Sequence, residues 1–117
     1  MQWYGERSIE SLSDFYKDYH RRLGRSIEHI RTIQMIKLAT EVGEALQEFE
    51  GTHDYNPRKG TYGSDEKVAQ ELGDVIGTAM VSLFLFCSDP EKVSEDTVEK
   101  FHSRVKEYQE KEEKKIK

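Results

Sequence analysis

Several residue types that mark particular protein classes are scarce in this sequence of 117 residues. The one cysteine, Cys87, excludes a disulfide within the chain and a zinc site built from cysteines. Basic residues are not in excess, because 18 Lys and Arg against 23 Asp and Glu leave a net charge of −5. A general nucleic-acid-binding protein normally shows a basic excess, so we expect no nucleic-acid partner.

Long hydrophobic runs are absent as well. The most apolar window, residues 75–87, is shorter than the about 20 residues that a membrane-spanning helix needs. The N-terminal residues 1–11 contain no apolar stretch preceded by positive charge, which a secretory signal would have. We therefore expect a soluble, cytoplasmic protein with no membrane partner.

What the sequence does contain favours helices. It has only two prolines and is rich in Glu, Lys and Gln, which are good helix formers. Apolar residues recur at helical spacing over residues 8–22, 26–50 and 65–86, and again from Pro90 onward. Ser8 and either Ser64 or Asp65 can cap helices, and Gly24 and Gly51 are placed to end them.

The predicted fold is therefore all-α, a four-helix bundle in a single domain over residues 1–117, since chains usually divide only beyond about 200 residues. The last part of the fourth helix, residues 105–117, is a charged tail that we expect to fray. The second half of the third helix, residues 76–87, is apolar nearly all the way round. Such a helix must be covered on all sides, so we expect a homo-oligomer.

Carboxylates line one face of each of the two central helices. At about 100° per residue, Glu41, Glu44 and Glu48 form one acidic stripe, with Lys37 one turn earlier. The third helix carries a polar stripe formed by Glu71, Asp74, Thr78 and Ser82. Because carboxylates on a largely buried helix need a cation, we expect either a metal ion or a base such as Lys37 beside them. All-oxygen ligation suits Mg²⁺ or Mn²⁺.

These carboxylates have two other interpretations. A solvated acidic face is common on exposed helices and is the alternative for the second helix taken alone. A di-iron site needs Glu-x-x-His on two helices, and none of the four histidines follows a glutamate of these stripes at that spacing. The di-iron interpretation is therefore rejected.

The two carboxylate pairs resemble a known family. Glu41-Val-Gly-Glu44, followed after residues 45–70 by Glu71-Leu-Gly-Asp74, is similar to the E-x-x-E … E-x-x-D signature of MazG-like all-α nucleoside triphosphate pyrophosphohydrolases. The wider strings at residues 37–49 and 70–77 agree with it, and the likeness covers about residues 26–106. The chain departs from the family at Thr40, where a second glutamate is usual, and in a fourth helix without the family's asparagine.

The resemblance implies a function. Members of the family hydrolyse nucleoside triphosphates (NTP or dNTP) to the monophosphate and pyrophosphate, with Mg²⁺, as helical dimers or tetramers. Carried over by motif, the metal ligands are Glu41, Glu44, Glu71 and Asp74. Lys37 would contact phosphate or orient Glu41, so Glu41, Glu44 and Lys37 are the expected catalytic residues. Mn²⁺ is a possible substitute for Mg²⁺.

Further residues are candidates for binding substrate. In the loop of residues 51–63, Arg58 and Lys59 could reach phosphates, and Tyr55 and Tyr62 could stack on a base, although an ordinary exposed loop is the alternative. The remaining candidates are Glu48, Thr78, Lys100 and Arg104. Three glycines, at positions 43, 73 and 77, lie inside helices, and Gly43 and Gly73 are expected to let other backbones approach closely, with neutral surface glycines as the alternative.

A second function stays open. A helical assembly protein could keep a metal- or nucleotide-binding seam without turnover. Thr40 is the residue that keeps this alternative open, because it removes one acidic group from the expected site.

Overall fold

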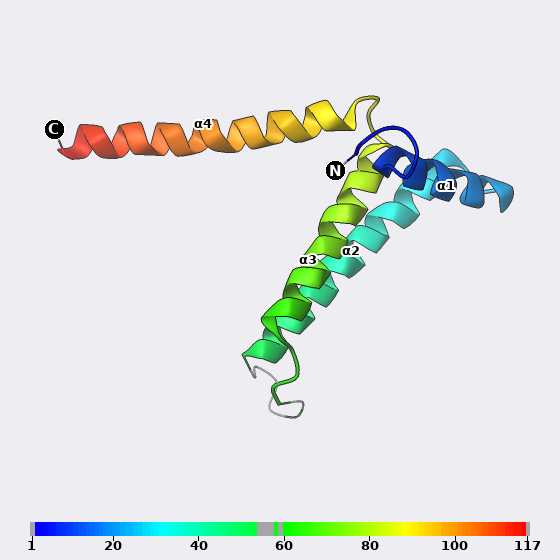
Figure 1. Cartoon of the computed structure of the whole chain (residues 1–117), viewed down its shortest axis with the longest axis horizontal. Coiled ribbons are helices and arrows are strands. Elements are labelled where there is room, and N and C mark those ends of the chain that lie inside the picture. Colours follow the sequence, from blue (N-terminus) through cyan, green and yellow to red (C-terminus); the bar gives the residue numbers. More distant parts are fainter. Residues whose placement is uncertain (1, 54–57, 59, 117) are drawn as a thin grey trace. The chain divides into compact units, whose positions relative to one another are not determined.

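The computed structural model describes residues 2–53, 58 and 60–116, and its regular structure is entirely helical (Figure 1). The four helices are α1 (Ile9–Arg22), α2 (Ile27–Thr52), α3 (Asp65–Leu83) and α4 (Pro90–Ile116). The all-α prediction is confirmed for these described residues. The chain divides into two compact units, Met1–Phe86 and Cys87–Lys117.

Serines begin three of the helices. Ser8 Oγ accepts a hydrogen bond from the Ser11 amide at 3.1 Å, and Ser11 Oγ accepts one from the Ser8 amide at 2.9 Å. Ser26 caps α2 in the same way, through the amide of residue 29. Ser64 caps α3 by accepting from the Lys67 amide at 3.2 Å. These side chains satisfy amides that have no partner inside the helix, and the predicted caps at Ser8 and Ser64 are confirmed.

The helix ends follow the prediction less closely. Gly24 has a φ of +76°, the left-handed conformation that closes α1 just after its C-cap, as expected. Gly51 does not end α2, which continues to Thr52. A Cβ at Gly51 would lie 2.5 Å from a ring carbon of Tyr62, so this glycine makes room for a side chain of the following connection.

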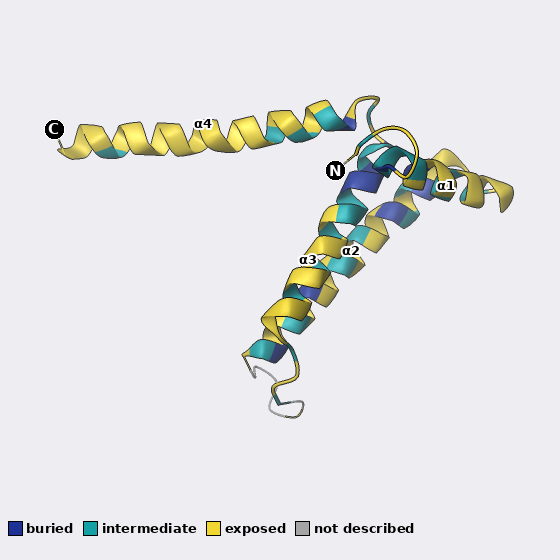
Figure 2. Ribbon diagram, viewed as in Figure 1, coloured by how far each residue is buried: buried dark blue, intermediate teal, exposed yellow. Residues whose placement is uncertain are grey.

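The first unit is built on a helical hairpin. α2 and α3 run antiparallel and pack chiefly on each other, and α1 packs against α3 (Figure 1). The buried hydrophobic residues lie along the contact between the helices (Figure 2). They are Ile30, Ala45, Met80, Val81 and Leu85.

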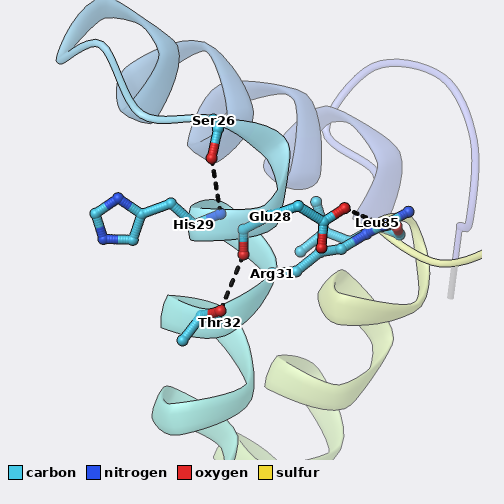
Figure 3. Close-up of polar contacts among 6 residues, drawn as sticks. All are labelled: Ser26, Glu28, His29, Arg31, Thr32 and Leu85. Atoms are coloured by element: carbon cyan, nitrogen blue, oxygen red, sulfur yellow. Dashed lines mark hydrogen bonds and ion pairs between the residues drawn. The ribbon is translucent and has the colours of Figure 1, made fainter.

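A polar contact ties the start of α2 to the segment that follows α3. Arg31 Nε donates to the Leu85 carbonyl at 2.9 Å, and Arg31 also pairs with Glu28 at 3.0 Å (Figure 3). The Arg31 guanidinium lies 5.1 Å from the centre of the Phe86 ring. α3 accordingly ends at Leu83, three residues before the expected end, and residues 84–86 form turns.

The expectation that the end of the third helix needs cover from another subunit is wrong for part of it. Met80, Val81 and Leu85 are buried within this chain, where the N-terminal residues Trp3 and Tyr4 also pack on the ring of Phe84. Phe86, the last residue of this stretch, stays exposed, and further exposed apolar side chains lie earlier on the hairpin.

The second unit is the single helix α4. Pro90 is its first residue, as predicted, because its missing amide would be unpaired there in any case. Val98, Phe101, Val105 and Tyr108 share one face of α4 and are all exposed. The helix continues through the charged segment to Ile116, so fraying of that end stays a prediction about its motion.

None of the helices in the described part of the chain is both long enough and apolar enough to cross a membrane.

Candidate functional site

Three carboxylates from two helices converge in the hairpin. Glu41 and Glu44 come from α2 and Glu71 comes from α3, and one oxygen of each lies within 4.8 Å of the others. Glu41 and Glu71 are half-buried, whereas Glu44 is exposed. Spacing of three residues places Glu41 and Glu44 one turn apart on the same face, and the packing of α3 on α2 brings Glu71 opposite them. We call Glu41, Glu44 and Glu71 the carboxylate cluster.

Asp74 and Glu48 lie near this cluster but outside it. Asp74 is exposed, one turn along α3 from Glu71, and it does not share the close spacing of the three glutamates. Its charge nevertheless acts on both Glu41 and Glu71. Glu48 is half-buried one turn beyond Glu44, and its charge acts on Glu71. The site therefore holds five acidic groups on two helices.

Crowding makes these carboxylates harder to ionise. Partial burial and then the neighbouring charges of Glu44 and Asp74 raise the pKa of Glu41 above its ordinary value. Partial burial, followed by the charges of Glu44, Asp74 and Glu48, raises the pKa of Glu71 in the same direction. A bound cation would reverse both effects by favouring the ionised form.

The donor set fits a hard divalent cation. Within the described part of the chain, no lysine or arginine forms an ion pair with the three glutamates of the cluster. Glu71 Oε2 and Glu48 Oε2 are buried without any hydrogen-bond partner among the described residues. The closely spaced carboxylates of the cluster are the all-oxygen ligands that Mg²⁺ and Mn²⁺ prefer.

A cavity of about 380 Å³ adjoins the carboxylate cluster. It is open to solvent and is lined by residues of all three helices of the first unit, and its polar lining consists of Tyr16, Gln34, Lys37, Glu41, Asp74 and Thr78. Apolar side chains of Ile9 and Leu12 from α1 and of Val81 from α3 also line it. We call this space the central cavity.

Two helical glycines, Gly73 and Gly77, lie in the lining of the central cavity. No side chain or neighbouring helix among the described residues comes within 4 Å of the place where a Cβ would stand at Gly43, Gly73 or Gly77. Close approach of another backbone, which was predicted for Gly43 and Gly73, is therefore wrong within the described part of this chain. Gly73 and Gly77 instead leave space beside the acidic groups.

The other predicted site residues lie partly in the central cavity and partly outside it. Lys37 and Thr78 line the central cavity with Glu41, and Lys37 Nζ lies 4.9 Å from the centre of the Tyr16 ring. Arg58 is exposed in the connection between α2 and α3. Lys59 and Tyr55 lie outside the described residues.

Tyr62 does not join the carboxylate cluster. The Tyr62 hydroxyl donates to the Gln47 carbonyl at 2.9 Å and its ring lies on Gly51, so this side chain is engaged with α2. Lys100 and Arg104 lie on α4, in the second unit. Lys100 Nζ and Arg104 Cζ are each 6.0 Å from the centre of the Phe101 ring. Their contact with substrate stays a prediction.

Tyr16 and Gln34 line the central cavity but were not predicted as site residues. Gln34 was detectable, because it lies three residues before Lys37 and seven before Glu41 and so continues their stripe on α2. Tyr16 belongs to the apolar face of α1, where the spacing indicates only a residue that packs on a neighbour.

Comparisons with models of protein families, with curated proteins and with solved structures found no match for this chain.

Proposed function

We propose that this protein is a Mg²⁺-dependent nucleoside triphosphate pyrophosphohydrolase, which converts an NTP or dNTP to the monophosphate and pyrophosphate. The observation that carries the proposal is the convergence of Glu41, Glu44 and Glu71 from two helices at metal-ligand spacing. The sequence signature that these residues share with MazG-like enzymes supports it independently.

The residues of the site have separate roles in this proposal. Glu41, Glu44, Glu71 and Asp74 hold Mg²⁺, with Asp74 moving toward the carboxylate cluster from its position one turn away. The ion, when bound, neutralises charge on the transferring phosphoryl group and lowers the pKa of a coordinated water. Lys37 contacts a phosphate oxygen from its place beside the carboxylates. Glu48, Thr78, Arg58, Lys59, Lys100 and Arg104 are the further candidates for contact with the substrate.

The proposal extends to assembly. Enzymes with this signature are helical dimers or tetramers, and we propose the same for this chain, with α4 completing a four-helix bundle. The exposed apolar side chains of the hairpin and of α4 support this part of the proposal.

A non-catalytic metal- or nucleotide-binding protein is the second candidate, and Thr40 favours it. The Thr40 hydroxyl donates to the Ile36 carbonyl within α2 at 3.1 Å, so it is engaged with its own helix and replaces an acidic group. Binding needs only the cation and the cavity, whereas turnover also needs a base beside the water.

The first experiment is a screen of all NTPs and dNTPs with Mg²⁺ that measures pyrophosphate and orthophosphate separately. We expect pyrophosphate from at least one nucleotide. If no nucleotide is hydrolysed, the enzyme proposal is wrong and the binding protein remains the candidate.

The second experiment replaces one ligand, Glu44→Gln. The fold should hold, because Glu44 is exposed and its charge opposes ionisation of Glu41 and Glu71. Pyrophosphate release should fall at least about 10²-fold, since one lost electrostatic contact to the reacting groups is worth about 3 kcal/mol. Glu50→Gln, at an exposed glutamate of the same helix outside the cluster, is the matched control and should keep full activity. Equal rates in both variants would contradict the catalytic role.

A further inference from the structure

We propose that the central cavity is the nucleobase subsite and that Gln34 is the residue that recognises the edge of the base. The inference rests on the proposed function, because it assigns the part of the substrate that the carboxylates do not hold. It also predicts how selective the subsite is.

Gln34 is the side chain that indicates a ligand in the central cavity. It is only 5% exposed, and its amide makes no hydrogen bond within the described part of the chain. The fully buried, unpartnered polar atoms of the described residues do not include this amide, so its oxygen and amino group still reach open space. Gln34 lines the central cavity, so a ligand there can supply the missing hydrogen bonds.

The walls of the cavity suit a flat ring. Gly73 and Gly77 lie one turn apart on α3, and a Cβ at either position would project into open space. Leu12 and Val81 add apolar surface, and Tyr16 adds an aromatic ring. A planar heterocycle can lie against apolar and aromatic groups of this kind while its polar edge meets Gln34.

The order of residues along α2 matches the order of groups in a nucleotide. Gln34 precedes Glu41 by seven residues, which is two turns or about 10 Å along the helix axis. Lys37 lies between them. A nucleotide with its phosphates at Glu41 and Lys37 therefore has its ribose and base directed toward Gln34.

A second cavity, of about 310 Å³, shares Tyr16, Gln34 and Lys37 with the central cavity. Its remaining lining comes from Phe15, Tyr19, His20 and Ile33, and it contains no carboxylate. The base of a metal-bound triphosphate is therefore assigned to the central cavity, which Glu41 and Asp74 also line.

The free amide of Gln34 makes the subsite tolerant of different bases. A glutamine amide offers one acceptor and one donor group, and rotation about its last bond exchanges them. No hydrogen bond from the described residues fixes Gln34 in one orientation. Cytosine presents an amino donor beside a ring acceptor, and uracil presents the reverse order, so Gln34 can pair with either.

The first test uses binding without metal. Dissociation constants of CMP and UMP are measured in EDTA for the full-length wild type, Gly77→Ala and Gly43→Ala. Both variants replace a helical glycine with open space around it, but only Gly77 lines the central cavity. We expect Gly77→Ala to weaken binding at least tenfold while its melting temperature holds or rises. Gly43→Ala should match the wild type. No binding of either nucleotide to the wild type, or equal binding by the two variants, would overturn the assignment.

The second test changes the hydrogen-bonding pattern. Gln34→Leu removes donor and acceptor, so it should weaken CMP and UMP alike, by at least about tenfold. Gln34→Glu, measured at about pH 8 to keep the new carboxylate ionised, offers acceptors only, so it keeps one hydrogen bond to the N–H of either base and sets its second oxygen against a base acceptor. It should therefore also weaken CMP and UMP alike, by at least about tenfold. The wild type should bind the two within about tenfold of each other. Gln34→Leu binding as tightly as the wild type would show that Gln34 does not contact the base.

The two proposals fail separately. Monophosphate binding that depends on Gln34 and Gly77, together with no triphosphate hydrolysis, would support the subsite and overturn the enzyme. Triphosphate hydrolysis that is equally efficient in the wild type, Gln34→Leu and Gly77→Ala would support the enzyme and overturn the subsite.

Discussion

Glu71 illustrates how one residue of the carboxylate cluster affects both stability and function. Burial and three neighbouring carboxylates oppose its ionisation, and one of its oxygens lacks a hydrogen-bond partner among the described residues. In the absence of a cation, the folded chain therefore holds a charge that the unfolded chain would hold more easily. A site of this kind lowers the stability of the metal-free protein and raises its affinity for a divalent ion.

The pH dependence of stability should reveal this effect. The pKa of Glu71 is raised in the folded chain, so its protonated form contributes stability below the ordinary glutamate range, and this is lost as the pH rises through the folded pKa. Glu71→Gln keeps the neutral shape at every pH. In EDTA, the variant should melt above the wild type at about pH 7, and the difference should shrink toward about pH 4.

Thermal unfolding at the two pH values measures this difference, with Glu50→Gln as the control that should show no such trend. An advantage of Glu71→Gln that grows as the pH falls would contradict the raised pKa. With Mg²⁺ added at about pH 7, the order should change, because the ion stabilises the wild type by binding only its folded state.

At the scale of the helices, local signals in the sequence predicted what depends on local structure. Ser8, Ser64 and Pro90 begin helices because each satisfies or avoids an unpaired amide within one turn. The predicted end of α2 was wrong because Gly51 makes room for the ring of Tyr62, eleven positions away. The end of α3 lies beside the hydrogen bond that Arg31 donates. Long-range contacts of this kind leave no periodic trace in the sequence.

The candidate site was likewise predicted only in the part that depends on local spacing. Helical spacing on α2 and α3 predicted that glutamates from both helices face one seam, and three of them do converge. Asp74 lies apart from them, and the space beside Gly77 was not expected. Both features depend on the rotation of α1 and α3 about their own axes. The hydrophobic pattern shows which face of a helix is buried, but it does not define this rotation finely enough to place a single side chain.

The connection between α2 and α3 gives a prediction at this scale. A Cβ at Gly63 would collide with the backbone carbonyl oxygen of Glu48, which a change of rotamer cannot relieve. Gly63→Ala should therefore destabilise the protein by about 1–3 kcal/mol. Gly43→Ala, in open space inside α2, should instead stabilise it by about 1 kcal/mol, because alanine favours the helix. Urea unfolding of both variants measures the difference, and destabilisation by Gly43→Ala would show an unseen contact at that position.

For the whole molecule, the exposed apolar surface is the main feature. Leu46 is 57% exposed, Leu72 51% and Ile76 58%, and an apolar cavity of about 310 Å³ lies between α2 and α3 beside Leu46 and Leu72. Burying one such side chain is worth about 1.5–3 kcal/mol, so a second subunit gains much by covering them.

We therefore expect the full chain to be a dimer or larger at micromolar concentration, as measured by light scattering after size-exclusion chromatography. Ile76→Asp should shift it toward the monomer, because a charge would have to be buried in the interface. Gln47→Asp, at an exposed polar position of α2, should leave the assembly unchanged. A wild-type monomer at these concentrations would contradict the prediction.

α4 has a consequence for how the protein responds to dilution. Pro90 is its only buried residue within the described chain, whereas most helical stability in proteins comes from packing of an amphipathic face. If α4 gains its stability by association, its helical order becomes a function of protein concentration. Circular dichroism at 222 nm should then lose intensity on dilution well before α2 and α3 unfold. Folding of the last quarter of the chain would thus be coupled to encounter between molecules.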